Sequence, residues 1–350
     1  MSVKICKIDE EMADEWNRMI YESPHGTIFH TWKWLTIAGK HSGYTLHPLI
    51  GYVKNKPVAL FPLFHRKKFG LNFVFSPPPH TALLYLGPVF LFDDKMQQNK
   101  KEIIYSSFLD GINDYIKQEL HAQYVQVYLP PKLHDPRPFA WSGYTVKPEY
   151  NYETDVRLGA DYLMENLPKK KRQDINRAYK RGITVELGGK EELEVIYNLM
   201  VERYKEQGRS VLVPLEYLFE IYDTYHDHIK IFITKYDGEI ATGLIDVHYK
   251  DSLYSWVGNP KPSIEISPSP NDLLLWEEIL YCCEHGFTSY VTMGAAGNER
   301  LHTYYSSKFN PDLDVRFSAK KCSTIVRCIE SAYTNAYKPV KSNLKKSGFP

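Results

Sequence analysis

The sequence predicts a mixed α/β (α+β) fold made by tandem duplication of one unit, each copy a mostly antiparallel central sheet flanked by helices. Residues 229–258 indicate three consecutive antiparallel strands, because apolar and polar residues alternate and Asp237-Gly238 supplies hairpin turn chemistry. A similar strand, turn and strand occurs earlier, over residues 47–64. Both hairpins follow a helix rich in aromatic residues, so we interpret them as two copies of the same unit.

The first copy combines helices with strands. Apolar residues at helical or alternating spacing predict helices over 9–21, 31–40 and 102–120, and strands over 47–53, 58–64 and 124–129. Three consecutive prolines, Pro77 to Pro79, exclude helix and central strand and predict a loop. We assign these elements to a first domain over residues 1–150.

The second copy follows a similar order, from 151 to 338, and a basic tail follows over 339–350. Ser269 is expected to cap a helix over 270–285, with Asp272 completing a capping box and Gly286 ending the helix. The other elements are strands over 152–158, 183–187, 229–234, 240–249, 252–257, 289–293 and 315–319, helices over 169–181, 191–204 and 324–336, and a turn or helix over 299–309.

The composition is that of an ordinary globular protein. The chain has 350 residues, 43% hydrophobic and 24% charged, which is enough for two cores. A formal charge of +1 argues against a nucleic-acid binder steered by its overall charge. An apolar run of about 18 residues is lacking, so no membrane span is expected. The N-terminal residues lack the apolar centre of a signal peptide, and the five cysteines fit reduced thiols, so we expect a cytoplasmic protein.

The most basic stretch lies in the predicted helix at residues 169–181. It contains seven lysines and arginines and one acidic residue, Asp174. One interpretation is a solvated helix face, the usual role of a run of charges. The other is that Arg172 and Arg177 bind phosphates of a nucleotide-linked substrate or of a tRNA acceptor end, because the guanidinium fork matches phosphate oxygens.

Other chemical motifs are weak. His226-Asp227-His228 contains metal-ligating residue types, but no third ligand cluster is visible, so no metal site is predicted. The serine hydrolase signature G-x-S-x-G is absent.

Four stretches carry a resemblance to a known family. They are IFHTWKW at residues 28–34, YLGPVF at 85–90, LPKKKRQDINRAYKRG at 167–182, and the segment that runs from PNDLLLW at 270–276 to Phe309. In this order and spacing the chain resembles GNAT-fold acyltransferases of the Fem-type (FemAB-like) aminoacyltransferase group and their relatives, the acetyltransferases of polysaccharide clusters. The resemblance covers almost the whole chain. It implies two GNAT-like domains in tandem, with the second of the catalytic type.

The resemblance also implies a function in cell envelope biogenesis. The protein would be an N-acyltransferase that transfers an acyl or aminoacyl group to an amine of a nucleotide- or lipid-linked envelope sugar or peptide precursor. Acyl-CoA and aminoacyl-tRNA are the alternative co-substrates, and no tightly bound cofactor is expected. The Gln/Arg-x-x-Gly-x-Gly/Ala loop that cradles the coenzyme A pyrophosphate is absent, which weighs against acetyl-CoA. The alternative is a non-catalytic binding protein for a glycan or nucleotide-sugar.

Acyl transfer to an amine needs a polarised carbonyl and a deprotonated nucleophile, held in line. A GNAT fold commonly supplies the polarising amide where two central strands splay, and we expect this splay between the strands around Ile240 and Ser252. Tyr254 and Trp256 would then line the cleft. The alternative is that Trp256 belongs to the core.

The C-terminal motif departs from the family pattern. Fem-type enzymes usually carry Phe-Lys followed by Phe-Gly, and alignment on Lys308-Phe309 places Tyr305-Ser306 at the Phe-Lys pair. Lys308 and Ser306 are therefore the candidate catalytic residues, with Lys308 stabilising an oxyanion or a phosphate; the alternative is a surface lysine. The expected substrate-binding set also includes Asn271, Tyr304 and Tyr305.

Overall fold

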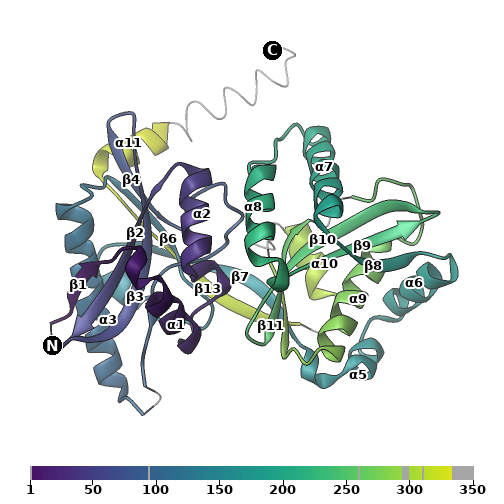
Figure 1. The fold of residues 1–350 in the computed structure, drawn as a ribbon, viewed down its shortest axis with the longest axis horizontal. Helices are drawn as coiled ribbons and strands as arrows, with labels where there is room; N and C mark the ends of the chain where they lie inside the picture. Colours follow the sequence, from purple (N-terminus) through teal and green to yellow (C-terminus); the bar gives the residue numbers. More distant parts are fainter. Residues whose placement is uncertain (1, 94, 259–260, 294–298, 310, 333–350) are drawn as a thin grey trace.

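The computed structural model describes residues 2–93, 95–258, 261–293, 299–309 and 311–332. Its strands join in one sheet with helices on both faces (Figure 1). The strand order is β1-β2-β3-β4-β6-β13-β7-β12-β11-β10-β9-β8, with β5 beside β3. Most neighbours are antiparallel, and the parallel pairs are β4 with β6 and β11 with β12. The predicted fold class is thereby confirmed, although the two units share a single sheet.

The strands are β1 (Lys4–Lys7), β2 (Thr45–Val53), β3 (Lys56–Lys68), β4 (Leu71–Ser76), β5 (Val89–Phe90), β6 (Tyr124–Tyr128), β7 (Thr145–Asp155), β8 (Thr184–Gly188), β9 (Ile229–Tyr236), β10 (Glu239–Tyr249), β11 (Ser252–Gly258), β12 (Ser289–Thr292) and β13 (Asp312–Cys322). The helices are α1 (Ala13–Glu22), α2 (Trp32–Ser42), α3 (Gln98–Gln118), α4 (Arg137–Trp141), α5 (Ala160–Glu165), α6 (Lys169–Lys180), α7 (Lys190–Glu206), α8 (Leu215–Tyr225), α9 (Pro270–Glu284), α10 (Glu299–Ser306) and α11 (Thr324–Ala332). Among the described residues, none of these helices is long and apolar enough to cross a membrane.

The strand order contains the predicted duplication. From each edge inward, four antiparallel strands are followed by a strand parallel to the fourth: β1 to β4 and then β6, and β8 to β11 and then β12. The next strands are exchanged between the units, because β7 pairs with β12 of the second unit and β13 pairs with β6 of the first. β7 and β13 also pair with each other, so the exchange joins the two halves into one sheet.

The two hairpins have the same turn. Lys54 and Asn55, between β2 and β3, have φ of 47° and 63°, and Asp237 and Gly238, between β9 and β10, have φ of 52° and 82°. Positive φ at both central residues defines the type I′ turn, whose twist matches that of the flanking strands. The same local geometry therefore closes the corresponding hairpin of each unit.

The two faces of the sheet have separate cores. Helices α1, α2, α7 and α8 cover one face, around Trp16, Trp34 and Tyr217. Neighbouring residues of β10 point to different clusters, Ile245 to this one and Leu244 to the cluster under α6 and α9. Helix α3 covers the first unit on that second face. We call the first face, which both units contribute to, the shared face; α2 and α8 contact each other there (Figure 1).

Two local predictions are wrong and one stays untested. The strand predicted over 152–158 is β7, which begins at Thr145 and ends at Asp155, because residues 156–158 form a 3-10 turn. Asp272 does not complete a capping box: the Ser269 hydroxyl accepts a bond from the Asn271 N–H at 3.4 Å, and Asp272 pairs with lysines instead. The boundary at residue 150 falls within β7, and the division into two domains stays a prediction. The tail over 339–350 lies outside the described residues.

Candidate active site

Strands β11 and β12 pair over only part of the length of β11 and then separate. We call this separation the parting. Their parallel ladder runs from Ser252 and Ser289 to Ser255 and Thr292. In the described part of the chain, β11 then continues to Gly258 in register with β10 alone. The register between β10 and β11 passes over Trp256, which forms a β-bulge. A bulge leaves its extra residue unpaired in the ladder, so backbone groups at Trp256 are candidates for polarising a carbonyl.

The splay does not lie where the sequence placed it. It was expected between the strands around Ile240 and Ser252, but β10 and β11 pair from Tyr249 with Ser252 to Leu244 with Gly258. The parting lies one strand further toward the centre of the sheet, because β12 ends while β11 continues.

The corresponding position in the first unit is closed by main chain. The ladder of β4 and β6 ends at Ser76 and Val127. The segment after β4 then returns: the Leu86 N–H donates to the Tyr128 carbonyl and the Gly87 N–H donates to the Ser76 hydroxyl, each at 3.0 Å. The first unit therefore fills its own parting; among the described residues that follow β11 and β12, no segment returns in this way in the second unit.

A buried cluster of charges lies at the first turn of α9. Helix α9 follows β11 and runs back to the start of β12, so its first turn lies at the end of the sheet where the strands part. Lys308, only 4% exposed, forms an ion pair with Asp272 in this turn. The other carboxylate oxygen of Asp272 accepts a hydrogen bond from Lys171 of α6 at 2.9 Å. The Lys308 ammonium also lies 4.2 Å from the centre of the Tyr304 ring.

The environment of Lys308 changes its protonation. Burial is the main cause that lowers the pKa of Lys308, to about 6, and the nearby Lys171 ammonium adds to the effect. The carboxylate of Asp174 acts in the opposite direction. A lysine amine whose pKa lies near neutrality can accept and return a proton at physiological pH.

The other predicted residues near Lys308 differ in their solvent exposure. Tyr305 is buried, whereas Ser306 is exposed and its hydroxyl donates to the Thr303 carbonyl at 3.3 Å. Asn271 lies in the first turn of α9, next to Asp272. The structure therefore brings Lys308 and Tyr304 together. Asn271 is adjacent in sequence to Asp272, the partner of Lys308, and Ser306 lies on the surface.

The two predicted arginines lie on α6 beside this cluster. Arg177 pairs with Asp174 of the same helix, and its side chain is 60% exposed. Arg172 donates to the backbone carbonyl of Glu165 at 3.2 Å. Helix α6 thus directs Lys171 to the cluster under α9 and leaves the Arg177 guanidinium accessible.

Tyr254 and Trp256 lie on the shared face and not with Lys308. The Trp256 ring is 5.2 Å from that of Trp34, and its indole N–H donates to the Ala82 carbonyl at 3.1 Å. Tyr254 packs near Phe29, at 6.2 Å between ring centres. Both side chains therefore belong to the core that joins the two units, and the Trp256 backbone is what lies at the parting.

A pair of acidic side chains is buried beneath the parting. Asp246 of β10 and Glu278 of α9 are both fully buried, and the Tyr290 hydroxyl donates to Glu278 at 2.5 Å. Burial raises the pKa of Glu278 to about 8, and burial together with Glu278 raises the pKa of Asp246 well above its ordinary range. Neither oxygen of Asp246 has a hydrogen-bond partner within the described protein. The pair therefore holds protons at neutral pH.

Sequence reasoning missed the partners of Lys308. Asp272 was read as a helix cap, because it follows Ser269 at the capping-box spacing, and Lys171 was one of several lysines in a basic run. Asp246 is a single polar residue between Ile245 and Val247, which is the signal that could have identified it, whereas Glu278 follows Glu277 and has no such signal. Among the described residues, no group of three or more His, Cys, Asp or Glu side chains could hold a metal ion.

Comparison with known proteins gives one family match within the second unit. Residues 169–310 match the family described as "Acetyltransferase (GNAT) domain", and this range contains the parting, α9 and Lys308. A comparison with curated protein sequences found no match.

Solved structures share the fold over nearly the whole chain. FemX superposes with a TM-score of 0.69 at 15% identity, covering 95% of this chain and 99% of FemX. L-PGS from Bacillus licheniformis has a TM-score of 0.54 at 14% identity, over 92% of this chain and 96% of that one. A tandem GNAT protein from the clavulanic acid biosynthesis pathway has a TM-score of 0.52 at 11% identity, over 91% and 98%. The TM-scores and coverages show that these proteins share the fold of this chain.

Proposed function

We propose that this chain, whose residues 169–310 form a GNAT acetyltransferase domain, is an N-acyltransferase that acts on an amine of a cell-envelope sugar or peptide precursor. The acyl or aminoacyl group would come from acyl-CoA or from aminoacyl-tRNA. The likeness of the whole fold to FemX supports a tandem enzyme of this kind. A cytoplasmic location agrees with donors of either type.

The observation that carries the proposal is the asymmetry between the two units. The first unit closes its parting with Leu86 and Gly87, whereas β11 continues past the last residue of β12 in the second. A bulge and a buried lysine with a lowered pKa lie at this same end of the sheet. Acyl transfer needs a polarising amide and a proton acceptor near the attacking nitrogen, and these two features supply them.

In the proposed reaction the acceptor nitrogen attacks the carbonyl carbon of the donor ester or thioester. The carbonyl oxygen becomes negative and is stabilised by backbone N–H groups at the Trp256 bulge. The Lys308 amine, which is mostly neutral at physiological pH because its pKa is lowered to about 6, accepts the proton that the nitrogen loses, while Asp272 holds it in place. As the C–O or C–S bond breaks, Lys308 returns this proton to the leaving oxygen or sulfur, so the amide and the free carrier are formed with no net change in protons.

The donor phosphates are assigned to α6 and the start of α9. Arg177 is accessible, and Arg172 lies one turn before Asn176 on the same basic helix. The missing Gln/Arg-x-x-Gly-x-Gly/Ala loop favours aminoacyl-tRNA over acetyl-CoA. The side chains of Asn271, Tyr304 and Tyr305 would position the acyl group near Lys308.

Mass spectrometry of reaction products tests this proposal. The full chain is incubated with acetyl-CoA or alanyl-tRNA and with UDP-linked muramyl pentapeptide or UDP-linked amino sugar, and the acceptor mass is measured. We expect the mass of the acceptor to increase by one acetyl or alanyl group when the wild-type enzyme is present, and to stay unchanged without it. If the acceptors bind tightly but no donor is ever consumed, the protein is a non-catalytic binding protein and the proposal is wrong.

A further inference from the structure

We propose that one end of the first unit is a docking surface for the anionic face of a lipid bilayer. The surface combines the tip of the hairpin between β3 and β4 with helix α11, and we call it the docking end. It consists of Phe69, Ile325 and Ile329 with the basic residues around them. The parting and Lys308 belong to the second unit, so the inference does not depend on the proposed reaction.

The hairpin tip and α11 leave the same end of the sheet. Phe73 of β4 and Cys322 of β13 are both opposite Tyr124 of β6, one on each side. Phe69 lies four residues before Phe73 along β4, and α11 begins at Thr324, just after Cys322. Because β4 is parallel and β13 antiparallel to β6, both segments extend beyond the start of β6, roughly 10 Å apart across two strand spacings. Figure 1 shows them at the same end of the first unit.

The hairpin tip carries an unusual residue for its turn. Phe69 and Gly70 have φ of 52° and 76°, the same type I′ geometry as the other two hairpins. Asn, Asp and Gly are favoured in this turn, and a bulky residue at positive φ is strained. The Phe69 side chain is 90% exposed, so packing within the protein does not offset this cost. Strained residues are concentrated at functional positions, which indicates that a partner covers the Phe69 ring.

Helix α11 adds aliphatic side chains to the docking end. Ile325 and Ile329 are 64% and 54% exposed, and Cys328 beside them is exposed as well. Residues four positions apart lie on one face of a helix, so the two isoleucines form an outward apolar stripe, while Val326 packs inward. Single exposed hydrophobic residues are common on proteins, but a stripe at the same end as an exposed phenylalanine is typical of an interaction surface.

The hairpin tip is also cationic. Arg66, Lys67 and Lys68 precede Phe69 and are all exposed, and the Lys68 ammonium lies 5.2 Å from the centre of the Phe69 ring. Residues 65–72 include no Asp or Glu. Within the part of the chain that the structure describes, none of the three cations pairs with a carboxylate. The exposed ring therefore lies beside uncompensated positive charge.

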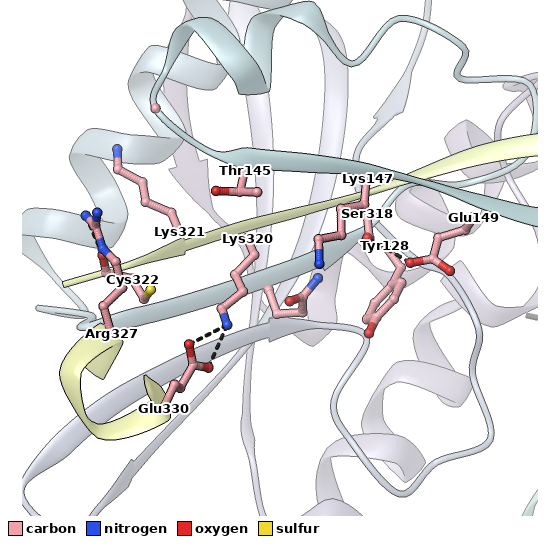
Figure 2. A pocket seen from close by; sticks show the side chains of 12 residues that line it. Tyr128, Thr145, Lys147, Glu149, Ser318, Lys320, Lys321, Cys322, Arg327 and Glu330 are labelled. Carbon is pink, nitrogen blue, oxygen red and sulfur yellow. Dashed lines mark hydrogen bonds and ion pairs between the residues drawn. The ribbon is translucent and has the colours of Figure 1, made fainter. Parts of the chain in front are cut away.

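Positive charge continues onto α11. Lys321 and Arg327 donate to backbone carbonyl groups at 2.9 Å and 3.4 Å, contacts that do not neutralise their charge. Figure 2 shows both side chains extending away from the ion pair that Lys320 forms with Glu330. The tail over 339–350, which lies outside the described residues, has three lysines and no acidic residue in its sequence. The apolar stripe thus has cations on either side of it along the chain.

A bilayer that contains anionic lipid matches this combination. Aromatic and aliphatic side chains gain free energy by entering the acyl region, while lysines and arginines beside them contact lipid phosphates. A nucleic acid would satisfy the charges but leave the isoleucines exposed, because bases stack on aromatic rings. In a symmetric dimer the patch would face itself, and its cations would repel each other. The bilayer is the partner that uses both the charges and the apolar side chains.

Co-sedimentation of the full chain with lipid vesicles tests the inference. One set of vesicles is phosphatidylcholine, and the other contains about one-third phosphatidylglycerol. We expect binding at least about tenfold tighter to the anionic vesicles, with affinity that falls as salt is raised. Lys67→Gln with Lys68→Gln should weaken this binding at least about tenfold, because each charge near the surface contributes about fivefold. Lys54→Gln with Lys56→Gln, at the other end of β3, is the matched control and should leave it unchanged.

The apolar residues are tested separately. Ile325→Gln with Ile329→Gln should weaken vesicle binding at least about tenfold, whereas Leu212→Gln, at another exposed aliphatic residue, should not. Phe69→Asn should weaken binding about tenfold and raise the melting temperature, because Asn tolerates positive φ better than Phe. A variant that is more stable and binds less cannot owe its loss of binding to misfolding.

Binding to anionic vesicles that both the charge variants and the apolar variants weaken supports the inference. Absence of binding, equal binding to neutral vesicles, or binding that either set of variants leaves unaltered overturns it. Sedimentation velocity and titration with an RNA oligonucleotide test the other occupants. A dimer that Ile325→Gln with Ile329→Gln dissociates, or RNA binding, in the absence of vesicle binding also overturns it. Acyl transfer is measured separately by product mass, so failure of the proposed reaction is distinguished from failure of this inference.

Discussion

Lys308 and Asp272 form a buried ion pair at the first turn of α9, and Lys171 shares the same carboxylate. The pair joins the segment after α10 to α9, and Lys171 adds α6. These three segments surround the end of the sheet where β11 and β12 part. Because the pKa of Lys308 is lowered to about 6, its amine is mostly neutral at physiological pH, and the Lys171 ammonium compensates the charge of the Asp272 carboxylate.

Replacing Lys308 should remove acyl transfer. Lys308→Met keeps the length of the side chain and removes the amine, so we expect the rate to fall about 10²- to 10⁴-fold, the usual contribution of a positioned acid or base. The check is product formation under saturating donor and acceptor. The matched control is Lys235→Met, another lysine in an ion pair, with Glu186 at 2.8 Å, for which the rate should stay within about threefold. A Lys308→Met enzyme with wild-type rate would exclude Lys308 as the proton carrier.

The buried acids should make stability depend on pH. The pKa of Glu278 is raised to about 8 from an ordinary value near 4.5, so the folded state holds a proton that the unfolded state releases. This contribution is complete below pH 4.5 and is lost as the pH rises through 8. We expect the melting temperature to be lower at pH 9 than at pH 6.

Glu278→Gln keeps the shape and cannot ionise, so its melting temperature should change less between these two pH values. Differential scanning calorimetry of both proteins measures the difference. Glu284→Gln, an exposed position near the end of the same helix, is the control and should behave as wild type. Equal pH dependence in wild type and Glu278→Gln would show that Glu278 is already ionised in the fold.

The sequence was sufficient for the architecture because local patterns encode it. The Asp237-Gly238 turn and its earlier counterpart identified the duplication, and both turns have the type I′ geometry. The strand exchange was not foreseeable, since pairing between β7 and β12 depends on contacts between units that no local pattern records.

The site was only partly predictable for the same reason. Lys308 was identified through a family motif, but its burial and its pairing with Asp272 require the positions of α9 and α10. Trp256 illustrates the opposite error: an aromatic residue on a central strand suggested a cleft, and the side chain packs against Trp34 in the core. The alternation of apolar and polar residues along a strand predicts which side chains lie on the same face of the sheet, but it does not predict which face binds a ligand.

Gly87 should be essential to the closed parting of the first unit. Its φ of 64° is unfavourable for other residues, and an added Cβ would lie 3.0 Å from both Pro130 and the Tyr128 carbonyl. We expect Gly87→Ala to destabilise the protein by about 1–3 kcal/mol, measured by chemical denaturation. Gly143→Ala, at a φ of 81° with open space around it, separates the cost of φ from that of the contacts and should be milder. Equal losses would mean that the close contacts contribute nothing.

Charge reversal on α6 should separate binding from folding. Arg172→Glu combined with Arg177→Glu is expected to weaken donor binding at least tenfold, because both guanidinium groups are assigned to its phosphates. The melting temperature should change by no more than about 2 °C, because an exposed ion pair such as Arg177 with Asp174 contributes little. Lys190→Glu on α7 is an exposed control. Unaltered donor affinity in the double variant would assign α6 the role of a solvated face.

The position of a bound donor tests the central claim most directly. A crystal structure of the full chain with coenzyme A or with a non-hydrolysable aminoacyl-adenosine analogue would locate the acyl end. We predict that its carbonyl lies between β11 and β12, beside the Trp256 backbone and within reach of Lys308. A donor bound in the first unit, or one whose carbonyl lies away from this parting, would contradict the account.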